Sequence, residues 1–148
     1  MCKEFIIRPM QATDVEQVGR IEAECFTMPW SAGVFHKVLE DTKCLYLVAE
    51  TEGQIAGMCG LTNILGEADI SNVAVDAAFR GQGVAFAMLS ELIRRGEAVG
   101  IEAFTLEVRV SNAAAIRVYE KLGFVSEGIR PRFYERPLED AMIMWRRK

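Results

Sequence analysis

The segment that decides the fold is ISNVAVDAAFRGQGVAFAMLSELI, residues 70–93. It begins with an apolar run typical of a buried strand, turns at Gly81 and Gly83, and continues as an amphipathic helix that carries Val84 and Met88 on one stripe. Glycine has no Cβ, so the backbone of such a turn can approach a ligand closely. The unpaired N–H groups of the following helical turn attract anions. The segment therefore predicts an anion-binding strand-turn-helix unit.

The glycine turn is open to other interpretations. A simple strand-to-helix connection with a helix cap would also contain these glycines. Arg80 adds a fixed positive charge, which favours a phosphate ligand. Two nucleotide motifs do not fit: the chain has no G-x-x-x-x-G-K-[ST], and a dinucleotide G-x-G-x-x-G would need glycine where Phe86 stands.

The N-terminal side of this segment is predicted to hold a strand, two helices and a hairpin. The first helix is expected to begin with a capping box of Thr13 and Glu16, and the second with Ser31 as its N-cap. The strands are expected at residues 4–8, 43–50, 54–62 and 68–75.

The C-terminal side is predicted to hold a strand at residues 104–110 and a helix that begins at Ser111 and ends before Gly123. Two closing strands are expected at residues 124–128 and 140–146, with a loop at 129–139 between them. Hairpins are antiparallel and a strand-helix-strand crossover is parallel, so we expect an α/β domain with a mixed sheet.

Composition fits one folded domain over residues 1–148. Apolar residues make up 51% and charged residues 26% of the 148, which excludes the disordered classes. No apolar stretch approaches the roughly 20 residues that cross a bilayer. We therefore expect a cytoplasmic protein that does not bind a membrane, and we favour a monomer.

The chain offers few residues that could bind a metal ion or act as an activated nucleophile. The four cysteines, Cys2, Cys25, Cys44 and Cys59, are irregularly spaced, and the only histidine is His36. We therefore expect reduced thiols, no metal site and no histidine-activated nucleophile.

Charge is unevenly divided along the chain. Residues 1–74 carry 5 basic and 11 acidic side chains, whereas residues 75–148 carry 12 basic and 10 acidic ones. The net charge of −4 and the pI of about 5.1 disfavour nucleic acid as a partner, and the division of charge suits an anionic ligand on the second half and a cationic ligand facing the first half.

A second segment, LEVRVSNAAAIRVYEKLGF at residues 106–124, adds a family resemblance. Together with RGQGVA at residues 80–85, it resembles the GCN5-related N-acetyltransferase (GNAT) family over essentially the whole chain. PWS at residues 29–31, SNVAVD at residues 71–76 and the ending IRPRFYE…EDAMIM are similar to the ribosomal-protein alanine N-acetyltransferase subfamily. The resemblance implies a mixed, mostly antiparallel sheet flanked by helices, with a splayed central strand pair.

The resemblance also implies acetyl-CoA as co-substrate. The pyrophosphate would lie on the loop made of Arg80, Gly81, Gln82, Gly83, Val84, Ala85 and Phe86. The pantetheine arm would pair with the exposed strand edge at Val73, Ala74 and Val75, and Asn112 would be a further coenzyme contact. From the residues alone, the valines could be plain core residues and Asn112 a helix cap.

Two residues receive catalytic roles from the resemblance. Glu107 would be the general base; on periodicity alone it could also be solvent-exposed or paired with Arg109 on the same strand face. Tyr119 would be the general acid, since a phenol keeps its proton at pH 7; it could also be a core aromatic.

The acceptor substrate is the part of the function that the sequence specifies least. The resemblance places Trp30 and Tyr134 beside it, but the loop reads RFYERP, whereas the subfamily commonly has proline directly after its tyrosine. We expect a basic protein N-terminus as substrate, the alanine of a small-subunit ribosomal protein. The alternatives are other N-termini, a small amine, or a noncatalytic CoA-binding module.

Overall fold

A seven-stranded sheet forms the centre of the computed structural model, which describes residues 4–26 and 28–147. The strands are β1 (Ile6–Pro9), β2 (Cys44–Thr51), β3 (Gln54–Ile64), β4 (Glu67–Val75), β5 (Ala103–Arg109), β6 (Val125–Tyr134) and β7 (Glu139–Arg147). The helices are α1 (Val15–Cys25), α2 (Ala32–Glu40), α3 (Val84–Ala98) and α4 (Ala113–Lys121), with short 3₁₀ turns η1 (Ala12–Asp14) and η2 (Ala77–Phe79).

The sheet is mixed and mostly antiparallel, as predicted. Its order is β1-β2-β3-β4-β5-β7-β6, and only the β4–β5 pair among the described strands is parallel. The strand β7 follows β6 in the chain but lies between β5 and β6 in the sheet. The helix α3 makes the crossover between the two parallel strands.

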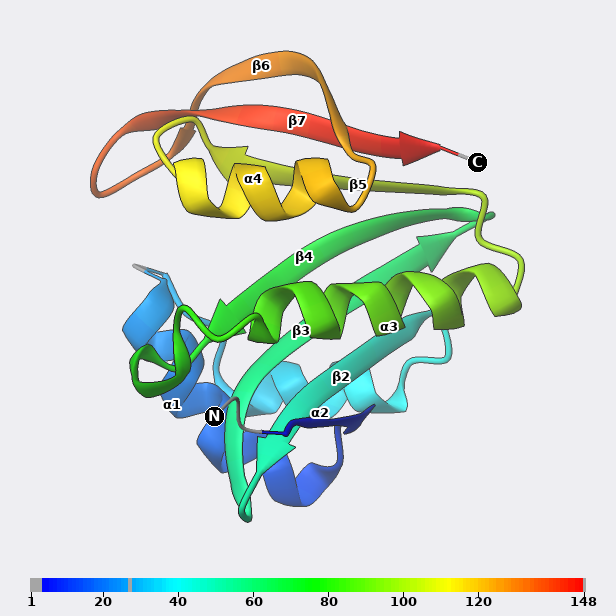
Figure 1. Cartoon of the computed structure of the whole chain (residues 1–148), viewed down its shortest axis with the longest axis vertical. Coiled ribbons are helices and arrows are strands. Elements are labelled where there is room, and N and C mark those ends of the chain that lie inside the picture. The colour runs from blue at the N-terminus through cyan, green and yellow to red at the C-terminus, as the bar shows by residue number, and fades with distance from the viewer. Residues whose placement is uncertain (1–3, 27, 148) are drawn as a thin grey trace.

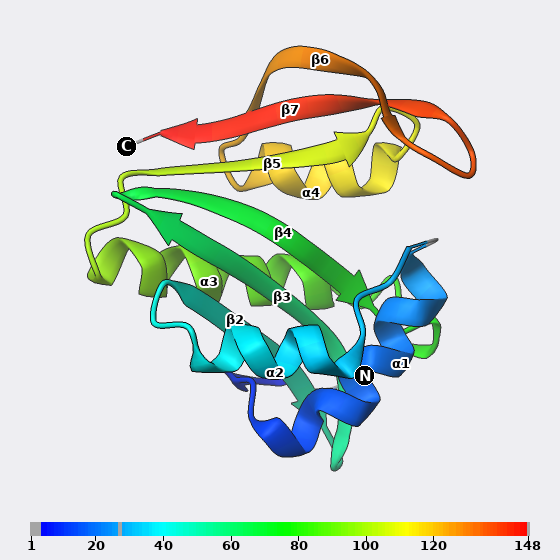
Figure 2. The ribbon, with the colours of Figure 1, turned by 180° about the vertical axis from the view of Figure 1, so that it is seen from behind.

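Helices cover both faces of the sheet. The helices α3 and α4 lie on one face (Figure 1), and α1 and α2 lie on the other (Figure 2). Side chains therefore alternate between two apolar clusters along a strand such as β2, where Leu47 and Ala49 join the α3 side and Tyr46 and Val48 join the α1 side. Burial on both faces explains why β2 and most of β3 lack a polar side, whereas β4 and β5 keep polar residues at alternate positions.

The C-terminal hairpin differs from the prediction. Residues 129–134, expected in a loop, belong to β6, which continues to Tyr134 despite Pro131. Since β6 is an edge strand, proline's missing N–H costs no sheet hydrogen bond there. The pairing with β7 is irregular between Arg130 and Tyr134, and Arg132 has a φ of 55°.

Two predicted helix starts are wrong, whereas one predicted start and one predicted end are confirmed. The Thr13–Glu16 capping box is replaced by a turn in which the backbone N–H of Gln11 donates to Asp14 at 2.8 Å. Asn112, not Ser111, caps α4 by accepting from the N–H of Ala115. Ser31 caps α2 as predicted, and Gly123 follows α4 with a φ of 94°.

The described part of the chain has no helix long and apolar enough to cross a membrane. Cys25, Cys44 and Cys59 carry free thiols, and Cys2 lies outside the described residues.

Candidate active site

The strands β4 and β5 pair only where they begin. The last pair joins Asp69 to Thr105. Beyond it, β4 remains paired with β3 and β5 with β7, so the two strands diverge (Figures 1 and 2). The β5-facing edge of β4 at residues 70–75 therefore has no strand partner among the described residues. Apart from the Val75 carbonyl, which accepts from Arg80 and Cys25, the backbone groups on this edge are available to an extended ligand.

A bulge at Ser71 marks the point of divergence. Ile70 lies opposite Leu61 and Asn72 opposite Gly60, which leaves Ser71 as an extra residue in β4. Gly60 is required because the ring of Tyr46 lies where a Cβ would be. The bulge thus fixes the direction in which the free edge of β4 runs.

A buried polar network fastens this bulge to α1. The Asn72 side-chain amide donates to Glu22 at 3.0 Å, and the Tyr46 hydroxyl donates to Asn72 at 3.0 Å and lies 3.1 Å from the Ser71 hydroxyl. Glu22 also accepts the backbone N–H of Trp30 at 2.9 Å. The network therefore holds the segment between α1 and α2 against the diverging strand.

The predicted anion loop has the features that a phosphate group needs. Gly81 and Gly83 have φ values of 77° and 78°, and nothing lies within 4 Å of where their Cβ atoms would be. The N–H groups of residues 81–86 have no acceptor among the described residues; the first helical bond runs from Ala87 to Gly83. Six free donors at a helix N-terminus fit an anion such as a pyrophosphate.

Arg80 is anchored at the entrance to this loop. Its Nε donates to the carbonyl of Val75 at 3.3 Å, and its Nη2 lies 3.5 Å from the thiol of Cys25. The side chains of Val73 and Val75 pack on the α3-side cluster, whereas Ala74 is buried on the α1 side. The positive charge therefore stands at the end of the free β4 edge.

Glu107 lies on β5 across the divergence from β4. Its side chain is 26% exposed, and its ion-pair partner is Arg130, with Oε1 and Nη1 3.8 Å apart. The expected alternative of a pair with Arg109 is wrong, because Arg109 instead donates to Glu139 and to two backbone carbonyls of the β6–β7 turn. Burial and the charge of Asp69 raise the pKa of the Glu107 carboxyl, and Arg130 opposes them. A raised pKa makes this carboxylate a stronger base.

Tyr119 lies on α4 with its ring buried against Phe124, the ring centroids being 6.0 Å apart. Burial raises the pKa of its phenol, so the hydroxyl keeps its proton. No hydrogen bond joins this hydroxyl to a described residue, and no fully buried side-chain N or O atom of these residues lacks a partner. The hydroxyl is therefore reached by solvent, although the ring belongs to the core.

The predicted acceptor residues lie on two different elements. Trp30, between α1 and α2, packs on Phe35 and Tyr46 with ring centroids 5.5 and 6.2 Å apart. Tyr134 ends β6 with the Arg109 guanidinium 4.5 Å from its ring centre. Burial and the nearby charge of Glu107 raise the pKa of Tyr134 to about 12, which places Tyr134 in the surroundings of Glu107.

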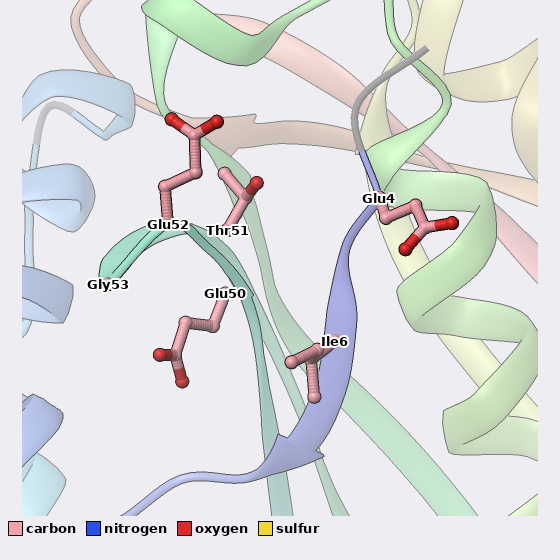
Figure 3. A pocket seen from close by; sticks show the side chains of 6 residues that line it. All are labelled: Glu4, Ile6, Glu50, Thr51, Glu52 and Gly53. Atoms are coloured by element: carbon pink, nitrogen blue, oxygen red, sulfur yellow. The ribbon is translucent and has the colours of Figure 1, made fainter.

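A hollow on the described surface lies away from these residues. It has a volume of about 350 Å³ and is lined by Glu4, Ile6, Glu50, Thr51, Glu52 and Gly53. Figure 3 shows Glu4 and Ile6 on the β1 side, Glu50 and Thr51 at the end of β2, and Glu52 on the turn that follows. Three carboxylates and no basic residue make this hollow unsuited to a phosphate ligand.

Sequence reasoning missed Asp69, Arg130 and the Glu22–Asn72 pair. Asp69 lay unremarked within the strand expected at residues 68–75, and Arg130 was expected in the loop at residues 129–139. Their contacts join distant parts of the chain, so no local pattern could have revealed them. Among the described residues, no group of three or more metal-ligating side chains is present.

Comparison with known proteins gives one consistent result. The model of the Acetyltransferase (GNAT) family matches residues 15–124. The Escherichia coli (strain K12) ribosomal protein bS18-alanine N-acetyltransferase is 36% identical over 140 residues, 93% of this chain and 94% of that protein. A Bacillus subtilis (strain 168) protein with a provisional assignment to the same activity is 37% identical over 140 residues, 94% of this chain and 93% of that protein.

A solved structure agrees with these relatives. The crystal structure of the ribosomal-protein-S18-alanine N-acetyltransferase from Escherichia coli superposes with a TM-score of 0.89 at 34% identity, covering 97% of this chain and 94% of that one. The splayed strands, the glycine loop before α3 and the length of the match lead to the same assignment. The chain belongs to the Acetyltransferase (GNAT) family.

Proposed function

We propose that this chain transfers the acetyl group of acetyl-CoA to the α-amino group of a protein N-terminus, the acceptor being the N-terminal alanine of ribosomal protein bS18. The observation that carries the proposal is the position of Glu107, a carboxylate of raised pKa. It lies on β5, which diverges from the free edge of β4, and β4 leads through η2 into the anion loop before α3. The acceptor proposed is the one on which the E. coli relative acts.

The coenzyme would be held by backbone groups more than by side chains. The free N–H groups of residues 81–86 and the Arg80 guanidinium would bind the pyrophosphate. The β4 edge at Val73, Ala74 and Val75 would pair with the pantetheine arm, and Asn112 would contact the coenzyme from the start of α4. The coenzyme supplies the acetyl thioester, and a β4 N–H would stabilise negative charge on its oxygen.

The proton transfers would be divided between Glu107 and Tyr119. Glu107 takes a proton from the acceptor amine, directly or through water, and the amine nitrogen forms a bond to the acetyl carbon as the carbon–sulfur bond breaks. An α-ammonium group has a pKa of about 8, so this base needs only modest strength. Tyr119 gives its phenolic proton to the departing sulfur as the carbon–sulfur bond breaks, and the phenolate then regains a proton from solvent. At pH 7 both the thiol, of pKa about 8.5, and the phenol are protonated once the reaction is complete.

The acceptor would lie between Trp30 and Tyr134. The excess of acidic side chains in residues 1–74 suits a basic protein such as a ribosomal protein. We propose that the enzyme acts in the cytoplasm as a monomer, by direct transfer in a ternary complex.

A peptide panel tests this function. The protein is mixed with acetyl-CoA and peptides that share one sequence but begin with Ala, Ser or Met, together with the Ala peptide carrying a blocked N-terminus and the polyamine spermidine. Release of free thiol and intact peptide mass are measured. We expect one added acetyl group on the Ala peptide and none on the blocked one.

Each other outcome has a defined meaning. Preference for Ser, Met or spermidine would move the acceptor to another N-terminus or to a small amine. Coenzyme binding without thiol release from any acceptor would make the chain a CoA-binding module and contradict the proposal.

A further inference from the structure

Three charged side chains from three strands gather where β4 and β5 part. Asp69 is on the last paired residue of β4, and its partner Thr105 lies two residues before Glu107 on the same face of β5. Arg130 of β6 lies opposite Ala141 of β7, and Ala141 lies opposite Arg109 of β5. Arg130 is therefore on the same face of the sheet as Arg109 and Glu107. Two carboxylates therefore face one arginine at the mouth of the proposed acceptor site.

The surroundings of Glu107 contain few other charges. The facing groups are Asp69 from β4, Arg130 and Tyr134 from β6, Arg109 from β5 itself, and the uncharged partner Ile143 from β7. Arg109 is already engaged by Glu139 at 3.2 Å. Among the residues that the structure describes, only Arg130 is thus a counter-ion for the two carboxylates.

Arg130 is held loosely. Its side chain is 54% exposed, its distance to Glu107 is 3.8 Å, and its other contact is with the ring of Phe133, 5.2 Å from the guanidinium carbon. A long, exposed ion pair contributes little to stability, so a competing cation displaces it at small cost. Asp69 is solvent-exposed as well, although the surrounding sheet atoms raise the pKa of its carboxyl. A cation from solution can reach both carboxylates.

We infer that Asp69 and Glu107 together bind the α-ammonium group of the acceptor, and that Arg130 occupies this place as a displaceable counter-ion in the free protein. The inference rests on the proposed function and adds how the substrate enters. Exchange of one cation for another leaves the charge of the site unchanged. One N–H bond of the ammonium group then breaks and its proton passes to the Glu107 carboxylate, which leaves the free amine ready to react.

The same arrangement couples binding to basicity. Arg130 lowers and Asp69 raises the affinity of Glu107 for a proton. When Arg130 moves away, Glu107 becomes a stronger base at the moment the amine arrives. Arg130 is therefore a positioning residue that acts through Glu107, whereas Asp69 both binds the ammonium group and raises the proton affinity of Glu107.

Two variants with opposite expected effects test the inference. Asp69→Asn is expected to raise KM for the Ala peptide about tenfold, the effect of losing one charge contact, and to move the acidic limb of the kcat/KM profile to lower pH. Arg130→Gln is expected to lower KM and to move that limb to higher pH. All variants are assayed with the same peptide, so a shift of the acidic limb between variants reflects a pKa of the enzyme and not of the peptide.

Matched controls remove the same charges nearby. Glu67→Gln lies on the same strand as Asp69, and Arg132→Gln lies on the same hairpin as Arg130; both should leave KM and the pH profile unchanged. Thermal unfolding and calorimetry with CoA establish that each variant folds and binds coenzyme. The inference would be overturned if Asp69→Asn and Arg130→Gln were folded and the acidic limb of their kcat/KM profiles stayed at the pH of the wild type.

A second measurement needs no turnover. Carbon-13 NMR titration of the Glu107 carboxyl should give a lower pKa in Asp69→Asn and a higher one in Arg130→Gln. In the wild type, the Ala peptide should shift the Arg130 Nε resonance, and the peptide with the blocked N-terminus should not. No response to either peptide would overturn the inference. A wild-type protein that responds in this way but acetylates no α-amine would instead contradict the proposed function.

Discussion

Glu107 is the residue on which the proposed chemistry depends most. Glu107→Gln keeps the shape of the side chain and removes its basicity, so we expect unchanged coenzyme affinity, a rate at least about 100-fold lower and loss of the acidic limb of the pH–rate profile. Because burial and Asp69 raise the Glu107 pKa, activity in the wild type should fall as the pH drops through a range above that of an ordinary glutamate. Steady-state kinetics against pH and calorimetry with CoA measure both effects.

Glu102→Gln is the matched control, since Glu102 is exposed and lies just before β5. It should behave as the wild type. If Glu107→Gln lost its fold or kept its full rate, Glu107 would have a structural role instead.

Tyr119 and Tyr46 form a contrasting pair of buried phenols. The Tyr119 hydroxyl has no hydrogen-bond partner among the described residues, so Tyr119→Phe should leave the melting temperature unchanged while the rate falls about 100-fold to 10,000-fold. A donor with a more acidic thiol should recover part of that rate. Normal turnover by Tyr119→Phe would make solvent the proton source.

In contrast, Tyr46→Phe removes the hydroxyl that donates to Asn72 and should lower the free energy of unfolding by about 1–3 kcal/mol.

The residues that sequence reasoning could find are those whose signal is local. Gly81 and Gly83 stand between a strand and a helix, and Glu107 interrupts an apolar strand. Asp69 and Arg130 gain their meaning from a contact between strands that are far apart in the chain, so only the fold could reveal them. The role of Glu22 was hidden for the same reason: its partner Asn72 lies 50 positions away.

The loop before α3 can be tested against a turn of equal geometry. Gly83 and Gly53 both have a φ of 78° and open space around a Cβ, but Gly53 lies in the β2–β3 turn. Alanine at either site should therefore cost about 1 kcal/mol of unfolding free energy from backbone strain. Only Gly83→Ala should also weaken CoA binding, as measured by calorimetry, because it distorts the row of free N–H groups. Equal coenzyme affinities in the two variants would place the phosphates elsewhere.

The junction between β1 and α1 should respond to pH. Arg8 donates two hydrogen bonds to Asp14 at 2.7 and 2.9 Å, and these contacts lower the pKa of the Asp14 carboxyl below its ordinary value. The pair therefore adds stability above the unfolded-state pKa of about 4 and loses it as the pH falls through the lower folded-state value. Asp14→Asn should lose about 1–2 kcal/mol at pH 7 and converge with the wild type in acid. Urea unfolding at several pH values measures this; a difference independent of pH would exclude the ionised carboxylate as its cause.

Elements with one clear period were predictable and irregular ones were not. The β2–β3 hairpin, β4 and α3 were expected within a few residues of their observed bounds, because periodicity and turn residues agree there. The extension of β6 past Pro131 was not expected, since the rule against proline in strands holds for central strands and the edge position of β6 follows only from the whole sheet. Likewise, the start of α1 depends on the Arg8–Asp14 contact rather than on Thr13.

At the scale of the molecule, the two parts of the sheet are joined by a short parallel pairing that ends at Asp69 and Thr105. A coenzyme lying between the diverging strands would bridge both parts, so binding should slow amide hydrogen exchange in residues 70–75 and 106–109 and raise the melting temperature. At 100 times Kd the expected gain is about 2.7 kcal/mol. The β1–β2 pair is the internal reference, since it lies at the far edge of the sheet. Protection confined to the loop at residues 81–86 would mean that the ligand does not bridge the strands.

The insertion of β7 between β5 and β6 also orders the events of folding. The strands β1 to β4 include three antiparallel neighbour pairs, two of them hairpins of low sequence separation, which close quickly. By contrast, β6 has no sheet neighbour until β7 has been made and docked. We therefore expect a partly folded chain to hold the glycine turn before α3 while β6, with Arg130 and Tyr134, is still undocked. Under the proposed function, the donor site would then form before the acceptor site, and the docking of β7 would complete the enzyme.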